Sequence, residues 1–354
     1  MHKLSLIFAL ATTLLSCTAA RMACFNRPTI HDSRLFVNAV LPTSDTAQNP
    51  PQRATFYACP TIDSLFDDGN TLGIVVLRGD SIIYSHFEGD LSLHTPTDLF
   101  SLSKSFVGAL TGIAIEQGYI RSIDDSIARY LPHCASFLGD SARICDLLNM
   151  RLGMFEPHLH TARLYYTPNL AQTASRLHHN RPHGEYNYAS NATQLLAHII
   201  EQATGLSFEE YFIDNYWIPC AASHEGFWSI DSRRHHNIRA FCGLCITPID
   251  LLKLGIIYRD NGALFGRQII PAEWVEHTLN PPYHTNDRGP ATYHCQWYII
   301  NPDHEFLGQG LMGQILYVNK ITDTVVARFG TARGKTDWTA ELGRIAALPN
   351  SYFP

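Results

Sequence analysis

The sequence predicts an α+β fold, in which helices flank an antiparallel sheet and a helical insertion fills the middle of the chain. Apolar, β-branched runs over residues 73–77 and 81–87 flank the turn Arg78-Gly79-Asp80, which is typical of a hairpin. Residues 315–318 and 324–329 form a second pair of β-rich segments near the C-terminus. Because strands at both ends of a chain can join one sheet while helices lie between them, we expect an α+β domain.

The middle of the chain carries the helical signals. Apolar residues at helical spacing predict a core helix over residues 102–117, with Gly118 as its stop. Further helical segments follow around residues 146–150 and 193–203. Thr247-Pro248-Ile249-Asp250 has the cap, the first-turn proline and the acidic residue of a helix start. These helices should pack on the core of the predicted sheet.

The N-terminus predicts export. A basic start precedes the apolar run Leu4 to Leu15, which is too short to span a bilayer, so residues 1–16 are expected to be a signal peptide. Ser16-Cys17 resembles the lipidation site of bacterial lipoproteins, so we expect a lipid anchor on Cys17 and a place in the cell envelope, in the periplasm or at the outer membrane. Cleavage after Ala20, releasing a soluble protein, is the alternative.

The rest of the chain divides at about residue 60. Residues 43–51 are polar and proline-bearing, so residues 17–60 are expected to form a tether or extension. Residues 61–354 should form one domain, with a helical subdomain at about 120–240. The net charge is −6 and no basic stripe occurs, which excludes nucleic acid as a partner.

Cysteine and histidine are frequent but not patterned as a metal site. Eight cysteines follow Cys17, an even number that could pair in an exported protein, although the pairing cannot be deduced. Cys242 and Cys245 form a lone CxxC, which fits buried small residues or a disulfide better than a zinc site. The histidine pairs lie in polar stretches without a metal-ligand spacing. We therefore expect no metal and no cofactor.

Ser101-Leu102-Ser103-Lys104 places a hydroxyl and an amine one helical turn apart at the start of the predicted core helix. An alcohol is a poor nucleophile until a base removes its proton. Burial and the positive end of the helix both disfavour the ammonium form of a lysine, so Lys104 could serve as that base. The backbone N–H of Ser101 could also face a developing oxyanion.

Several ordered segments resemble the serine β-lactamase and penicillin-binding-protein superfamily, in its class C-like branch of esterases, D-aminopeptidases and 6-aminohexanoate-dimer hydrolases. The matching segments are Phe100 to Phe106, Asp146 to Met154, Gly184 to Asn191, Thr247 to Gly255 and Gly310 to Gln314. The resemblance covers roughly residues 60–345. It implies that Tyr188 shares proton transfer with Lys104, and a phenol near a cationic lysine loses its proton more easily.

The chain departs from the class C pattern in two places. Ser190 stands where the family has an asparagine two residues after the tyrosine, with Asn191 as a shifted substitute. The third motif, with its lysine or histidine, is placed at Leu311-Met312-Gly313, where no cation occurs. Gly313 would border the substrate, and the backbone N–H of Gln314 would complete the oxyanion hole. Lys335-Thr336-Asp337 resembles the motif only by chance, because it follows the last predicted strand.

These features predict a serine hydrolase that forms an acyl-enzyme on a small ester or amide, and an esterase or amidase rather than a β-lactamase. The missing cation argues against efficient recognition of a substrate carboxylate. A non-catalytic, lipid-anchored binding protein on the same fold is the alternative. A histidine-rich metal-binding envelope protein is a third possibility, which bound metal in the purified protein would reveal.

Overall fold

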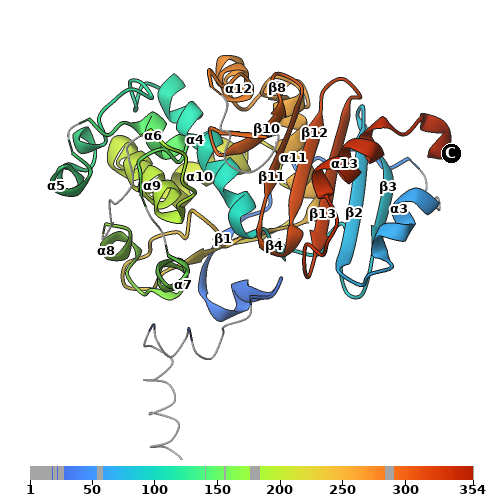
Figure 1. The fold of residues 1–354 in the computed structure, drawn as a ribbon, viewed down its shortest axis with the longest axis horizontal. Coiled ribbons are helices and arrows are strands. Elements are labelled where there is room, and N and C mark those ends of the chain that lie inside the picture. Colours follow the sequence, from blue (N-terminus) through green and yellow to red (C-terminus); the bar gives the residue numbers. More distant parts are fainter. Residues whose placement is uncertain are drawn as a thin grey trace, which may run out of the picture.

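The computed structural model describes residues 28–53, 59–139, 141–154, 157–175, 184–283 and 291–353, together with Thr18 and Met22. Within these residues, seven strands form an antiparallel sheet in the order β3-β2-β13-β12-β11-β10-β9 (Figure 1). Their bounds are β2 Thr71–Arg78, β3 Ser81–Phe87, β9 Thr292–His294, β10 Trp297–Asn301, β11 Glu305–Gln309, β12 Ile315–Asn319 and β13 Thr324–Gly330. Strand β13 pairs with β2, so the two ends of the chain share one sheet, as predicted.

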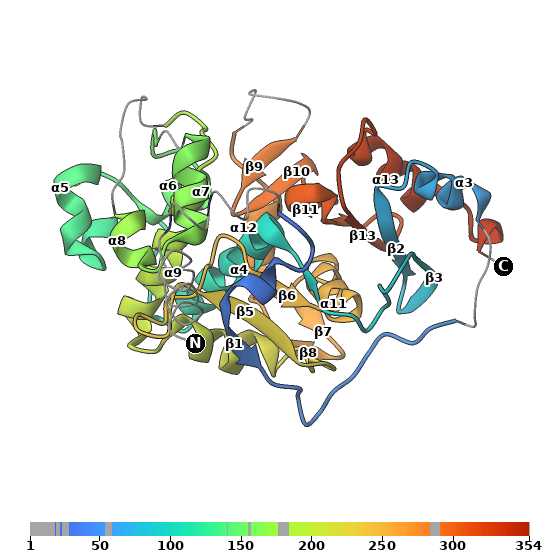
Figure 2. The ribbon, with the colours of Figure 1, turned by 90° about the horizontal axis from the view of Figure 1, so that it is seen from below.

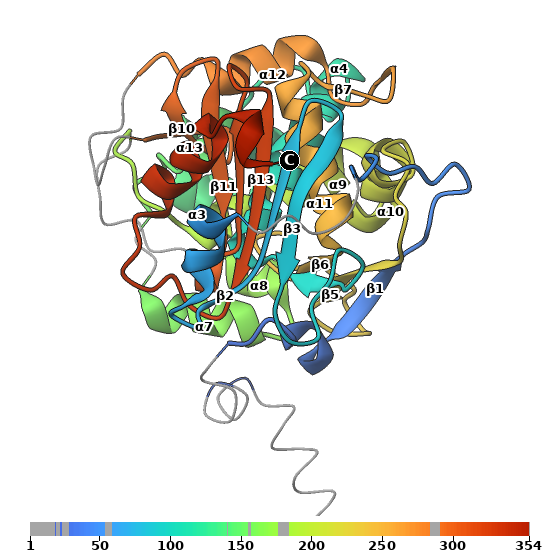
Figure 3. The same ribbon diagram turned by 90° about the vertical axis from the view of Figure 1, so that its right-hand side faces the viewer.

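Helices cover both faces of this sheet, because successive strand residues point to opposite sides. Val76 and Tyr317 face a small core with Trp338 of α13 (Trp338–Ala347), beside α3 (Pro60–Asp63). Val75 and Leu316 face the large core with α4 (Ser103–Glu116) and α11 (Pro248–Arg259). Figure 3 shows α3 and α13 on the near side of the sheet and α11 on the far side. Full burial of each such apolar side chain contributes about 1.5–3 kcal/mol.

The predicted helical insertion is present. Its helices gather on the side of the molecule away from β2 and β3 (Figure 1). They are α5 Ala135–Leu138, α6 Ile144–Leu148, α7 His158–Tyr166, α8 Leu170–Ala174, α9 Ser190–Thr204 and α10 Phe208–Phe212, followed by the π-helix η6 Ile213–Trp217. The remaining helix α12 (Ala272–Leu279) follows the two-residue strands β7 (Ala263–Leu264) and β8 (Arg267–Gln268).

A second sheet includes part of the segment that was predicted to be a tether or extension. Strand β1 (Val37–Leu41) pairs antiparallel with β5 (Gly226–Ile230), and Figure 2 shows β6 (Leu244–Ile246) next to β5. Strand β4 (Thr97–Asp98) pairs with β6 and completes the sheet. Asp32 is buried and accepts a hydrogen bond from the Tyr165 hydroxyl at 2.9 Å. Residues 28–41 are therefore part of the folded domain.

The expected signal peptide and Cys17 lie outside the described residues. In the part of the chain that the structure describes, no helix combines the length and the apolar character needed to cross a membrane.

Candidate active site

A cavity of about 650 Å³ is lined by Ser101, by Tyr188 and by residues 309–312 and 331–333. Pro28 also lines it, so the N-terminal segment contributes to its wall. Among its described lining residues there is no aspartate, glutamate, histidine or cysteine. The cavity therefore offers hydroxyl, amide and guanidinium groups rather than a set of metal ligands.

The local backbone presents Ser101 to this cavity. Ser101 lies in the short 3₁₀ helix η3 (Phe100–Leu102), which leads directly into α4. Phe100 before it has φ +48°, a left-handed conformation that costs a residue with a side chain about 1–3 kcal/mol. The buried Ser103 hydroxyl donates to the Phe100 carbonyl at 2.7 Å and accepts from the Leu244 N–H at 3.3 Å. Ser103 thus ties this strained turn to strand β6.

Lys104 meets Ser101 as the three-residue spacing predicted. Its side chain is 1% exposed, and Nζ donates to Ser101 Oγ at 3.0 Å and to the Phe241 carbonyl at 2.8 Å. Nζ also lies 5.0 Å from the centroid of the Tyr188 ring. At 3.0 Å, a neutral amine is within range to accept the proton of the Ser101 hydroxyl.

Tyr188 lies just before α9 and packs edge-on against the buried Tyr293, with ring centroids 5.9 Å apart. It lines the cavity together with Ser101. Ser190 and Asn191 do not, because both are buried in the first turn of α9. The Asn191 side-chain nitrogen instead lies 3.3 Å from Nε2 of His160. Ser190 does not line this cavity, so its contact with substrate stays a prediction.

Strand β11 lies beside the segment that carries Ser101. A Cβ on Gly308 would collide with Leu102 and would lie 2.9 Å from Ser105 Oγ. A Cβ on Gly310 would collide with the Leu99 carbonyl. Leu311 and Met312 of the predicted third motif line the cavity, whereas Gly308 does not. No lysine or histidine occurs in residues 305–314, so this strand and the loop after it carry no cation.

Gln314 is also placed differently from the prediction. Its side chain is buried and donates to the Gly330 carbonyl at 2.8 Å, and its backbone N–H points to the Leu311 carbonyl at 3.4 Å. In contrast, the N–H groups of Ser101 and Leu311 have no acceptor among the described residues, and both residues line the cavity. The structure thus favours Ser101 and Leu311, rather than Ser101 and Gln314, as the oxyanion donors.

The predicted substrate contact of Gly313 is likewise not seen, because this glycine is buried outside the cavity wall. The buried Arg328 on β13 holds the loop instead, donating to the carbonyls of Gly313 at 2.8 Å, Met312 at 3.1 Å and Ala332 at 3.0 Å. Burial lowers the pKa of Arg328 to about 10, still above neutral pH. Arg328 therefore positions two segments of the cavity wall, residues 312–313 and residue 332.

Arg333 is a cavity residue that the sequence reading missed. It follows β13, and its Cγ lies 3.4 Å from where a Cβ on Gly313 would be. Arg333 is exposed, and its guanidinium makes no ion pair or hydrogen bond with the described residues, so its charge can meet a ligand. The nearby Lys335 is exposed and does not line the cavity, which agrees with the rejection of Lys335-Thr336-Asp337 as a motif.

No disulfide links the cysteines that the structure describes. Cys242 and Cys245 are both buried, and burial raises the pKa of Cys242 to about 12. Both therefore act as small core residues, one of the two possibilities that the sequence left open.

Comparison with known proteins agrees with the fold. The curated 6-aminohexanoate-dimer hydrolase of Paenarthrobacter ureafaciens is 23% identical over 298 residues, 77% of this chain and 75% of that relative. A solved structure from Bacillus anthracis, proposed to be a 6-aminohexanoate-dimer hydrolase, superposes with a TM-score of 0.81 at 20% identity, covering 90% of this chain and 92% of that one. A class C β-lactamase from Rhodobacter sphaeroides superposes with a TM-score of 0.59 at 15% identity, covering 81% and 97%.

The family model described as Beta-lactamase matches residues 62–348. These comparisons and the strand order agree with the resemblance predicted from the sequence. Because the match spans most of the chain, the protein belongs to the β-lactamase family of the serine β-lactamase and penicillin-binding-protein superfamily.

Proposed function

We propose that the protein is a serine hydrolase that forms an acyl-enzyme at Ser101 on an ester or amide substrate. The observation that carries this proposal is the 3.0 Å contact between Ser101 Oγ and Lys104 Nζ, where Ser101 lines a cavity large enough for a small molecule. The strained turn at Phe100 supports it, because strain of this kind persists where function needs it.

The acylation step uses these groups in order. Neutral Lys104 takes the hydroxyl proton while Ser101 Oγ attacks the carbonyl carbon, and the carbonyl oxygen becomes an oxyanion. The N–H groups of Ser101 and Leu311 stabilise that charge, and one such donor contributes about 2.7–4 kcal/mol in comparable enzymes. Collapse of the intermediate expels the alcohol or amine, which receives a proton from the coupled pair of Lys104 and Tyr188.

Deacylation repeats the sequence with water as the nucleophile. Water loses a proton to the same pair, attacks the acyl carbon and releases the carboxylic acid, and Ser101 regains its proton. Every step uses side chains and backbone groups of this chain, so the proposed reaction needs no cofactor.

An esterase or amidase is favoured over a β-lactamase. The segment that resembles the third motif of the family carries no lysine or histidine to contact a substrate carboxylate. A non-catalytic binding protein on the same fold is less well supported, because it would not require a buried lysine against a cavity serine.

Export and lipid attachment remain part of the proposal. The apolar run before Cys17 supports a lipid anchor, which would hold the domain at a membrane surface in the bacterial envelope.

Labelling with a fluorophosphonate, read by intact mass, tests the acylation chemistry. The wild type should gain one probe adduct, and Ser101→Ala should gain none. Ser103→Ala is the matched control, because this serine lies two residues away and its hydroxyl is committed to the Phe100 carbonyl. A folded Ser101→Ala variant that is still labelled would refute the assignment, and a wild type that is never labelled would favour the non-catalytic alternative.

A further inference from the structure

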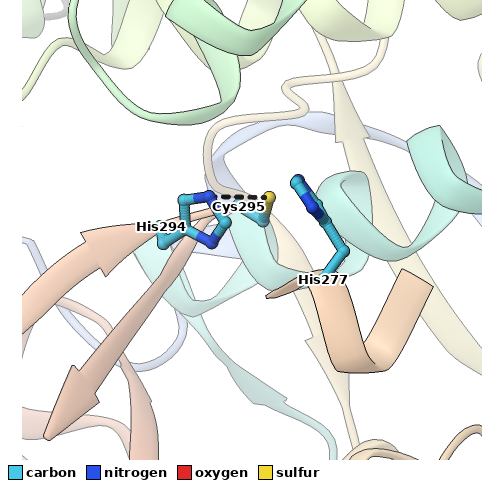
Figure 4. Close-up of side chains that lie close together, drawn as sticks. All are labelled: His277, His294 and Cys295. Atoms are coloured by element: carbon cyan, nitrogen blue, oxygen red, sulfur yellow. Dashed lines mark hydrogen bonds between the residues drawn. The ribbon is translucent and has the colours of Figure 1, made fainter. Parts of the chain in front are cut away.

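Three side chains that can bind metal converge away from the cavity. His277 comes from α12, His294 from the end of β9, and Cys295 from the turn between β9 and β10, as Figure 4 shows. One possible ligand atom from each lies within 4.8 Å of the others. His294 Nε2 and Cys295 Sγ are 3.9 Å apart, and tetrahedral zinc with ordinary bond lengths separates such a nitrogen and sulfur by about 3.6 Å.

The hydrogen bonding of the two histidines leaves nitrogens for a ligand. His294 Nδ1 lies 3.1 Å from the Thr278 carbonyl, which can only accept, so Nδ1 carries the proton. Its Nε2 therefore presents a lone pair on the side of Cys295, the arrangement found around histidine ligands of metals. His277 Nε2 is buried and has no hydrogen-bond partner among the described residues, which is costly unless something satisfies it.

We propose that His277, His294 and Cys295 bind one Zn²⁺ ion. Two imidazole nitrogens and a thiolate are the soft ligands that zinc prefers. The Cys295 thiol gives up its proton to the solvent when the sulfur–zinc bond forms.

A water molecule is the candidate for the fourth ligand. Within the described residues, no further histidine, cysteine, aspartate or glutamate joins His277, His294 and Cys295 at the spacing that one ion requires. Cys145 at the start of α6 is outside this group, and its Sγ lies 4.0 Å from a carboxylate oxygen of Asp124. An ion with three protein ligands keeps its fourth position for water.

The site would support the helix that carries the proposed catalytic residues. Cys295 and Gln296 have φ values of +45° and +69°, so this turn is strained without glycine. The Ser105 hydroxyl donates to the Gln296 carbonyl at 3.0 Å, and a Cβ on Gly108 would lie 2.6 Å from the Cys295 carbonyl. A metal on Cys295 would thus hold the turn against α4, one helical turn beyond Ser101.

Reconstitution with Co²⁺ tests the proposal. Full-length protein purified without a polyhistidine tag would be stripped with a chelator and titrated with Co²⁺. We expect one equivalent to bind, with visible d–d bands and a near-ultraviolet thiolate band that one equivalent of Zn²⁺ abolishes. The intensity of the thiolate band should correspond to one sulfur, and Cys145→Ser should leave it unchanged.

Variants locate the site. His277→Gln should weaken Zn²⁺ binding at least tenfold, and Cys295→Ser should remove the thiolate band. Cys220→Ser is the control, because Cys220 is also buried but bonds to the Trp217 carbonyl outside the cluster, so it should leave the spectrum unchanged. Wild-type binding below one-tenth of an equivalent, or a thiolate band that survives Cys295→Ser, would each overturn the proposal.

Discussion

Replacement of Lys104 by methionine separates catalysis from stability, because methionine fills similar space without the amine. The change removes the group 3.0 Å from Ser101 Oγ and leaves the Phe241 carbonyl without its donor. Loss of a general base should lower kcat/KM by about 100-fold to 10,000-fold. Because the Phe241 carbonyl loses its hydrogen-bond donor, the free energy of unfolding should fall by only about 1–3 kcal/mol.

Lys253→Met is the matched control. Lys253 is equally buried, but it pairs with Asp250 at 2.8 Å on α11 and does not line the cavity. Its loss leaves Asp250 buried without its cation, which should lower the free energy of unfolding by about 3–5 kcal/mol. The activity of the protein that remains folded should stay near that of the wild type.

The assay combines hydrolysis of a small activated ester with urea unfolding of the same preparations. The two variants should show opposite patterns, with Lys104→Met losing mainly activity and Lys253→Met losing mainly stability. A folded Lys104→Met enzyme within tenfold of wild-type kcat/KM would refute Lys104 as the base. If kcat/KM fell in proportion to the loss of stability in both variants, Lys104 would have only a structural role.

Three further predictions concern the catalytic unit, specificity and anchoring. Tyr188→Phe should lower ester turnover greatly, and combining it with Lys104→Met should add little, since groups acting as one unit are not additive; fully additive losses in kcat would contradict this. Neutral activated esters should be hydrolysed faster than cephalosporins. If the rate of cephalosporin hydrolysis falls at least tenfold in Arg333→Ala, Arg333 binds the substrate carboxylate. Cys17→Ala should abolish lipid labelling and membrane retention in a bacterial host, and unchanged detergent partitioning would reject the anchor.

Elements with local signals were predictable from the sequence. The hairpin of β2 and β3 has a glycine turn, and α11 is preceded by Thr247, whose side chain caps the helix by accepting from the Asp250 N–H. The β9–β10 hairpin was missed because its turn residues, Cys295 and Gln296, lack the usual glycine or asparagine. Tertiary contacts hold that turn, including two hydrogen bonds from the Gln296 side chain to the carbonyls of α6.

The same division holds within the site. Ser101 and Lys104 were predictable because a three-residue spacing on a helix fixes their distance. The second oxyanion donor was not predictable, because the sequence from Gly310 to Gln314 does not show which backbone N–H points toward Ser101. Arg333 lies in the loop after β13, and only the fold brings its stem beside Gly313.

Two glycines position the proposed oxyanion donor. Glycine at 308 lets β11 approach Leu102 and Ser105 more closely than a residue with a Cβ could without a shift of those side chains. Gly310 continues that approach against the Leu99 carbonyl, and the next residue, Leu311, then reaches the cavity wall beside Ser101. The close approach therefore places a backbone N–H near the proposed nucleophile. Under the proposed function this fits a change in substrate preference, and the comparison with Arg333→Ala tests whether Arg333, which lines the same cavity, binds a substrate carboxylate.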